Sequence, residues 1–280
     1  MAQAVLPVFF CVFSASLVAQ TTPAASAQQP AAPVQAADKP SISLSPAVVM
    51  AKGNFGQGLT QTLTLTNQTA RDFAFEMVAE DVIIKDGKRV FVPAGETPNS
   101  IAASAVFAQK TVLVKPFSSV TVEVRLTLPA QTNLRAVVAM FRGTDKLPSS
   151  SGAVGMTASL GSLITFNLTD NVKLQPEPVR VSPANESANM KIAQWISNSG
   201  TEPVLPEGAA AVLNSSGSLM GKTIFDPQRL LPGERLEFSA EYPGDLPPAN
   251  YRALCSFQFE GKTLTTEAAF EVPKAEVPKK

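Results

Sequence analysis

The sequence predicts an all-β protein built from two consecutive antiparallel β-sandwiches. Three observations support this prediction. Apolar and polar residues alternate with a period of two in many stretches, no helical periodicity of useful length appears after residue 40, and one part of the chain is echoed later. A period of two is typical of strands that bury one face, and short strands separated by Pro and Gly are typical of sandwiches.

The echo involves two stretches that lie roughly 117 residues apart. The first runs from Pro116 to Gly143 and the second from Pro232 to Gly261, and each holds an alternating strand, a proline, an Arg-Ala pair and a final Phe-X-Gly. Solenoid repeats are much shorter, so the echo predicts one β-domain used twice. We expect the first domain to span residues 41–172 and the second residues 173–273, with a disordered tail at 274–280.

The individual strands are predicted from runs of side chains on one face. Lys85-Asp86-Gly87-Lys88 lies between two apolar runs and predicts a hairpin, because Asp-Gly accepts a positive φ. The alternating residues expected to face a core are Leu63 and Leu65; Phe73, Phe75, Met77 and Ala79; Val120, Val122, Val124, Leu126 and Leu128; Leu236, Phe238, Ala240 and Tyr242; and Tyr251, Ala253, Cys255, Phe257 and Phe259.

The amino-terminal region predicts export from the cytoplasm. Residues 1–37 carry no charged side chain, and their apolar run is followed by the small-residue site Ala25-Ser26-Ala27. This pattern indicates a signal peptide over residues 1–27, cleaved before Gln28, and a disordered linker over residues 28–40 that is rich in Ala, Pro and Gln. The alternative is an uncleaved membrane anchor, since the apolar run approaches spanning length.

Composition argues against several functions. The 23 basic and 23 acidic side chains balance to a formal charge of zero, which leaves no electrostatic footprint for nucleic acid or for an anionic membrane around the mature protein. The chain has no histidine, so the usual general base and the commonest zinc ligand are missing. We expect no enzymatic activity, no cofactor and no metal.

Two single residues have a structural and a functional interpretation. After leader cleavage Cys255 is the only cysteine, and it shares a strand face with Ala253 and Phe257; we expect a buried side chain, matched by Val138 in the echo, rather than a reactive thiol. Trp195 is the only tryptophan, and we expect core packing rather than ligand stacking.

Several motifs resemble the periplasmic pilus-chaperone superfamily and related bacterial secreted proteins with two immunoglobulin-like domains. The first domain carries Ile42-Ser43-Leu44-Ser45-Pro46 and the run from Gln61 to Asn67, and the second carries Leu231-Pro232-Gly233-Glu234 and Tyr251-Arg252-Ala253. The resemblance covers about residues 41–272. It implies two consecutive immunoglobulin-like antiparallel β-sandwiches. It also implies a function, because pilus chaperones lend an alternating apolar strand to an incomplete subunit.

The same resemblance implies a partner-binding site. Ile164, Phe166 and Leu168 lie on one face at the donor-strand position, and Lys173 is similar to the lysine that anchors the subunit's terminal carboxylate. The first-strand arginine of that anchor has no counterpart, since Ala47, Val48 and Val49 occupy its neighbourhood. The alternative for Ile164, Phe166 and Leu168 is an ordinary core strand. The Gly- and Ser-rich stretch from Gly143 to Ser159 is predicted to be a long loop beside this site.

These observations favour a non-catalytic, periplasmic or secreted module that binds another protein by strand-edge or cleft contacts. A fimbrial-chaperone-like assembly factor with a pilin-like or surface subunit as partner is its more specific form. The alternative is an extracellular adhesin or scaffold domain that binds through surface loops.

Overall fold

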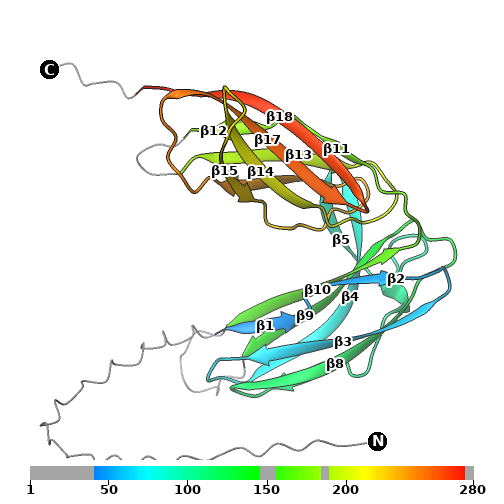
Figure 1. Ribbon diagram of the computed structural model, residues 1–280. Helices are drawn as coiled ribbons and strands as arrows, with labels where there is room; N and C mark the ends of the chain where they lie inside the picture. The colour runs from blue at the N-terminus through cyan, green and yellow to red at the C-terminus, as the bar shows by residue number, and fades with distance from the viewer. Residues whose placement is uncertain (1–40, 146–155, 184–188, 275–280) are drawn as a thin grey trace, which may run out of the picture. The chain divides into compact units, whose positions relative to one another are not determined.

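The computed structural model describes residues 41–145, 156–183 and 189–274, and almost all of its regular structure is β (Figure 1). The prediction of an all-β fold with two sandwiches is confirmed. Residues 39–280 form one compact unit. The predicted signal peptide and linker lie outside the described residues. Within the described part of the chain, no helix has the length and apolar character needed to cross a membrane.

Sandwich 1 consists of two sheets whose strand orders are β1-β3-β8-β6 and β2-β10-β9-β4-β5, with β7 pairing to β4. Its core lies between these sheets and holds Phe73, Phe75, Phe141 and Ile164. The strands are β1 (Ile42–Ser45), β2 (Val48–Lys52), β3 (Gly58–Asn67), β4 (Phe73–Lys85), β5 (Lys88–Pro93), β6 (Val106–Phe107), β7 (Thr111–Val114), β8 (Ser118–Thr127), β9 (Ala136–Asp145) and β10 (Thr157–Asn167), and the short 3-10 helix η1 (Ala102–Ser104) follows β5.

The alternating runs form the strands that they predict. Leu63 and Leu65 of β3 are fully buried, and the threonines that alternate with them along the strand are less buried. Strand β8 pairs with β3 over its whole length and buries Val122, Val124 and Leu126 on the same side. The hairpin between β4 and β5 turns at Asp86 and Gly87, whose φ values of 53° and 74° are both positive, as the Asp-Gly sequence predicts.

Sandwich 2 also has two sheets. In one, β11 and β12 both pair with β13, and β16 pairs with the other side of β13; in the other, the order is β15-β14-β17-β18. Val172 packs in this second core, although the predicted boundary assigns it to the first domain. The strands are β11 (Leu174–Pro176), β12 (Arg180–Ser182), β13 (Lys191–Asn198), β14 (Glu207–Asn214), β15 (Leu219–Ile224), β16 (Arg235–Glu241), β17 (Ala249–Phe259) and β18 (Lys262–Val272).

A glycine opposite a phenylalanine recurs in both cores. A Cβ atom on Gly143 would lie 2.3 Å from the ring of Phe75, and one on Gly208 would lie 2.3 Å from the ring of Phe257. No side chain fits at that distance, so these two strands carry glycine where a ring from the neighbouring strand lies flat against the backbone.

Two predictions about single residues need correction. Cys255 is fully buried in the core of sandwich 2, as expected, but Val138 does not occupy the matching place: it lies on the opposite face of its sheet, with Leu163 and Leu231. The spacing of the echo changes from 117 residues at its Arg-Ala motif to 118 residues at its Phe-X-Gly motif. Side chains on a strand alternate between faces, so this one-residue change puts Val138 and Cys255 on opposite faces of their sheets. Trp195 is half-buried on the outer face of β13, where the Arg235 guanidinium lies 4.0 Å from its ring.

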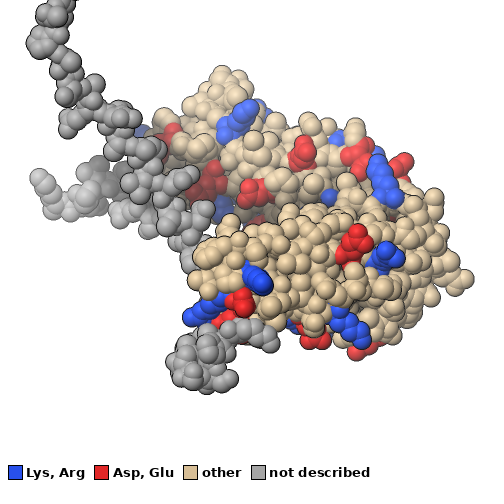
Figure 2. Space-filling view, turned by 90° about the horizontal axis from the view of Figure 1, so that it is seen from below, with Lys and Arg blue, Asp and Glu red and all other residues tan. Residues whose placement is uncertain are grey.

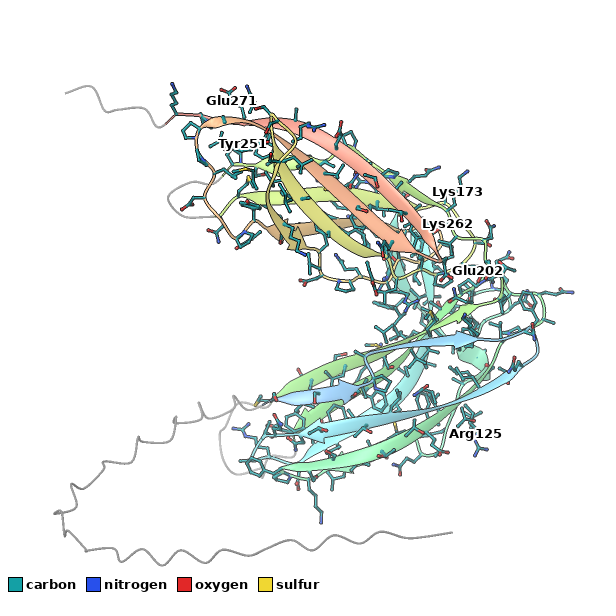
Figure 3. All side chains as sticks on the ribbon, in the orientation of Figure 1. Arg125, Lys173, Glu202, Tyr251, Lys262 and Glu271 are labelled. Carbon is teal, nitrogen blue, oxygen red and sulfur yellow. The ribbon has the colours of Figure 1, made fainter. Side chains whose placement is uncertain are left out.

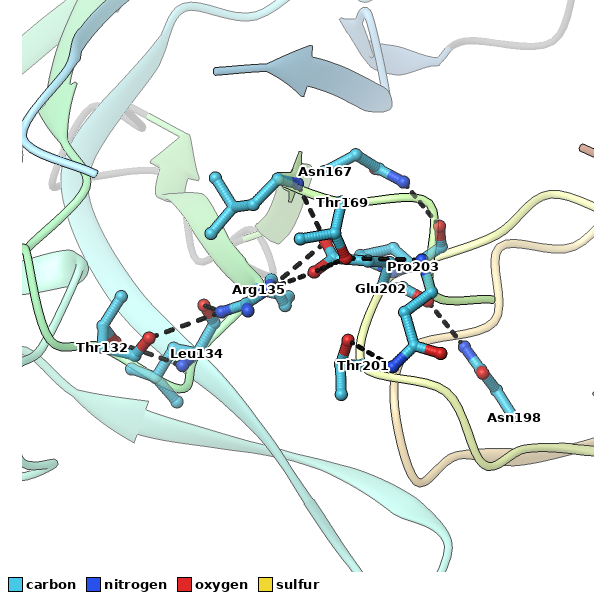
Figure 4. Close-up of polar contacts among 11 residues, drawn as sticks. Thr132, Leu134, Arg135, Asn167, Thr169, Asn198, Thr201, Glu202 and Pro203 are labelled. Carbon is cyan, nitrogen blue, oxygen red and sulfur yellow. Dashed lines mark hydrogen bonds and ion pairs between the residues drawn. The ribbon is translucent and has the colours of Figure 1, made fainter. Parts of the chain in front are cut away.

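Two buried glutamates of sandwich 2 bind arginines of sandwich 1. Glu202 accepts hydrogen bonds from Arg135 Nε at 3.2 Å, Leu168 N at 2.9 Å and Thr169 Oγ1 at 3.1 Å (Figure 4). Glu234 accepts from Arg89 Nε at 2.6 Å. Removing one partner of such a pair leaves a buried, uncompensated charge and costs about 3–5 kcal/mol, so these contacts tie the two sandwiches together.

We expect Cys255→Val to change the free energy of unfolding by less than about 1.5 kcal/mol at pH 7, because the swap keeps a small apolar side chain in the core. Burial raises the pKa of the Cys255 thiol from 9.0 to about 12. The folded state therefore holds the proton that the unfolded state releases. Above pH 9.0 the wild type should lose stability relative to Cys255→Val by up to about 1.4 kcal/mol per pH unit.

Urea unfolding followed by Trp195 fluorescence at several pH values measures this difference, since the only tryptophan lies in sandwich 2. A difference that stays constant between pH 7 and 10.5, or rapid labelling of the native thiol by a polar reagent, would contradict the burial of Cys255.

Candidate functional site: an open edge on strand β10

The structure separates the four residues that the sequence predicts as a partner-binding site. Ile164 and Phe166 are 0% and 3% exposed and pack in the core of sandwich 1, and Leu168 packs against the same core. Their positions match the alternative interpretation, an ordinary core strand. The side chains of Ile164 and Phe166 are too buried to contact a partner. Lys173 has an exposed side chain near sandwich 2, where Ser199 N donates to its carbonyl at 2.8 Å (Figure 3).

The predicted long loop from Gly143 to Ser159 is partly strand. Gly143 to Asp145 belong to β9 and Thr157 to Ser159 belong to β10, because the two strands pair up to Thr144 and Thr157. Residues 146–155, which include Leu147 and Val154, lie outside the described residues.

A different part of β10 has the properties of a binding site. β10 spans eleven residues and pairs with β9 along its length, but on its other side β2 pairs only with Leu163 to Asn167. The chain reaches β2 from β1, which belongs to the opposite sheet, through Pro46 and Ala47. β2 therefore begins too late to cover the first half of β10. We call Thr157–Gly161 the open edge; in the described part of the chain no strand pairs with it on the side away from β9.

Two backbone hydrogen bonds of β10 show which way the groups of the open edge point. Phe166 N donates to the Arg135 carbonyl of the β9 side at 2.9 Å, and Leu163 N donates to the Ala47 carbonyl of the β2 side at 2.9 Å. Backbone groups alternate along a strand, so even-numbered residues of β10 bond to β9 and odd-numbered ones face away from it. Thr157, Ser159 and Gly161 therefore direct their N–H and C=O groups outward.

The side chains of the open edge also divide into two faces. Ala158 and Leu160 are half-buried and pack against the core of sandwich 1, as do Ile42 and Leu44 of the neighbouring strand β1. Thr157, Ser159 and Gly161 are exposed on the outer face. A strand added here would find apolar side chains on its inner side and polar groups on its outer side.

A groove of about 520 Å³ lies at this end of the sheet and is lined by residues of β4, β7, β9 and β10, among them Arg142, Thr157 and Ser159. Arg142 forms an ion pair with Glu80 of β4, and the exposed Glu76 of the same strand also lines the groove. On the face of the molecule seen in Figure 2, basic and acidic side chains are interspersed and neither sign forms a large patch.

The arrangement offers backbone pairing and apolar contact rather than chemistry. Among residues 41–145, 156–183 and 189–274 no cluster of Cys, Asp and Glu has the geometry of a metal site. Ile164 and Phe166, which the sequence predicts as partner contacts, follow the open edge on the same strand. The sequence signal for the open edge itself is Pro46, which interrupts the first strand and delays the start of β2.

Comparisons with known proteins find similarity in structure only. No protein-family model matches the chain, and no curated protein matches its sequence. The class 5 fimbriae chaperone CfaA aligns over 84% of this chain and 100% of its own, at 13% identity and a TM-score of 0.43. The CsuC–CsuE chaperone–tip adhesion subunit complex of Acinetobacter baumannii aligns over 81% and 97%, at 12% identity and a TM-score of 0.40. The Salmonella enterica SafA pilin in complex with the SafB chaperone aligns over 84% and 99%, at 12% identity and a TM-score of 0.38.

We expect Phe166→Ala to destabilise sandwich 1 by about 3–5 kcal/mol, because it opens a cavity in a closed core. Lys173→Ala should change stability by less than about 0.5 kcal/mol, since its side chain is exposed. Denaturant unfolding followed by circular dichroism measures both. A Phe166→Ala protein as stable as the wild type would show that this ring does not contribute to the core. Phe166 would then again be a candidate contact for a partner.

Proposed function

We propose that this protein is a non-catalytic, periplasmic or secreted module that binds another protein by taking up one of its strands at the open edge of β10. In its more specific form this is the activity of a fimbrial-chaperone-like assembly factor. The observation that carries the proposal is the outward direction of the backbone groups of Thr157, Ser159 and Gly161, beside which β2 is missing.

The open edge has the size of a strand-pairing site. Five residues at about 3.3 Å each provide roughly 16 Å of unpaired strand, close to the length of an average strand. Exposed edges of this kind are normally shortened, charged or covered, because they pair with any available strand. Residues 157–161 contain no Lys, Arg, Asp, Glu or Pro, so none of the side chains that usually block edge pairing is present.

The neighbouring side chains define the partner's chemistry. Leu160, Ala158, Ile42 and Leu44 are half-buried between the edges of the two sheets, so a strand added to β10 gains apolar burial as well as backbone hydrogen bonds. The partner should therefore offer an extended segment in which apolar residues alternate with polar ones.

The test replaces Ser159 by proline, which removes an N–H group that points to the open edge and leaves the pairing with β9 intact. Thr157 is replaced by a photo-crosslinking residue, and the protein is irradiated in its own compartment so that its partner is captured. Ser159→Pro should abolish this capture, whereas Ser159→Ala, which keeps the N–H group, should preserve it.

A matched proline on another edge controls for unspecific damage. Phe225 N donates to the Gly208 carbonyl at 2.9 Å, so the N–H group of Lys222 in edge strand β15 points away from its partner β14. Lys222→Pro should leave capture at Thr157 unchanged. Capture that survives Ser159→Pro, in a protein whose thermal unfolding is unchanged, would contradict strand pairing at the open edge.

A further inference from the structure

Arg229 is a buried cation that has no acidic partner within residues 41–145, 156–183 and 189–274. It lies in the segment between β15 and β16 and is 8% exposed. Its Nη1 atom contacts Met50 Sδ at 3.0 Å, and thioether sulfur is a weak acceptor. Its Nε atom is buried and has no hydrogen-bond partner among the described residues. A charge buried in this way is costly unless something compensates it.

The other arginines that link the sandwiches are compensated. Arg135 binds Glu202 and Arg89 binds Glu234, and both glutamates are buried. Glu234 is not free to serve Arg229, because its oxygens accept from Arg89 and from Leu231 N. Arg89 even adds positive charge beside Arg229, since its Nη2 atom donates to the Arg229 carbonyl.

The electrostatics around Arg229 follow from these contacts. Burial, and then the charge of Arg89, lower the pKa of Arg229, and the charge of Glu260 acts in the opposite direction. Both lowering causes disfavour the charged form of the Arg229 guanidinium. A bound anion would favour the charged form and offset both effects.

A cavity of about 430 Å³ adjoins Arg229 and has room for such an anion. Its lining includes the cations Lys88, Arg89 and Arg229, together with the amide of Gln228 and the apolar side chains of Val48 and Leu236. Two further charged groups line it, and both are already paired: Glu234 with Arg89, and Arg235 with Glu177. The cavity therefore carries an excess of positive charge.

We propose that Arg229 is the receptor of an oxyanion site, in which Nε and Nη2 donate two parallel hydrogen bonds to one anionic group. This edge of a guanidinium matches a carboxylate, a phosphate or a sulfate group. The anion comes either as a carboxylate carried by a bound protein or as a free inorganic anion. The site stands independently of strand pairing at the open edge, because none of its contacts involves Thr157–Gly161.

The test uses the nitrogen-15 signal of the Arg229 Nε–H group in the full-length protein. Arg229→Lys identifies that signal by its loss. The protein is titrated separately with sodium acetate and with sodium phosphate, at an ionic strength held constant with sodium chloride. The Arg229 signal should shift and saturate, while the signal of Arg125, whose side chain is 72% exposed, should follow ionic strength alone. The shift should persist in Ser159→Pro.

Tighter binding of acetate than of phosphate assigns the site to a protein carboxylate, and the reverse order assigns it to an inorganic anion.

A second variant tests the site if Arg229→Lys does not fold. Arg229→Met removes an unpaired buried charge, so without added anion its melting temperature should equal or exceed that of the wild type. Its affinity for the anion should fall about ten- to a hundredfold, as expected for loss of charge-assisted hydrogen bonds. A wild-type signal that does not saturate with either anion would overturn the proposal.

Discussion

The crossing of the chain from one sheet to the other at Pro46 and Ala47 is the constraint on which the binding surface depends. β1 pairs with β3 in one sheet, and β2 pairs with the second half of β10 in the other. A single edge strand is thus divided into β1 in one sheet and β2 in the other. Neither of these two short strands pairs with the whole length of the strand beside it. The uncovered backbone groups of β10 are the direct consequence. They are held in an extended conformation by β9 on their other side, so an added strand would meet an ordered template.

The same segment is connected to the second sandwich. Directly after β10, Leu168 N and Thr169 Oγ1 donate to Glu202, and Asn167 Nδ2 donates to the Pro203 carbonyl at 2.8 Å. A buried acid of sandwich 2 therefore fixes the end of the strand whose beginning is open. Fixing the far end limits the freedom of β10 as a whole and lowers the entropy that strand pairing would cost. Arg229 differs from these contacts, since it is a buried arginine that forms no ion pair with the described residues.

Alternation predicted most of the fold, because each strand buries one face and side chains on a strand have a period of two. It predicted the core positions of Phe73, Phe75 and Phe257, and the Asp86-Gly87 pair predicted the turn between β4 and β5. It did not predict which strand lacks a neighbour, since that depends on pairing between residues far apart in the sequence. Ile164 and Phe166 have the alternating pattern of a donor strand, but the same pattern describes a core strand. Glu202 and Arg229 carry no local pattern, because their roles arise from contacts across the sandwiches.

Amide hydrogen exchange along β10 tests the central claim most directly. The amides of Ala158 and Leu160 bond to β9 and that of Leu163 bonds to Ala47, so all three should be protected. The amides of Thr157, Ser159 and Gly161 should exchange at rates close to those of unpaired backbone. This alternation between neighbouring residues is the result that the account predicts. Protection of Thr157, Ser159 and Gly161 equal to that of Leu163 would show that the edge is already covered and would contradict it.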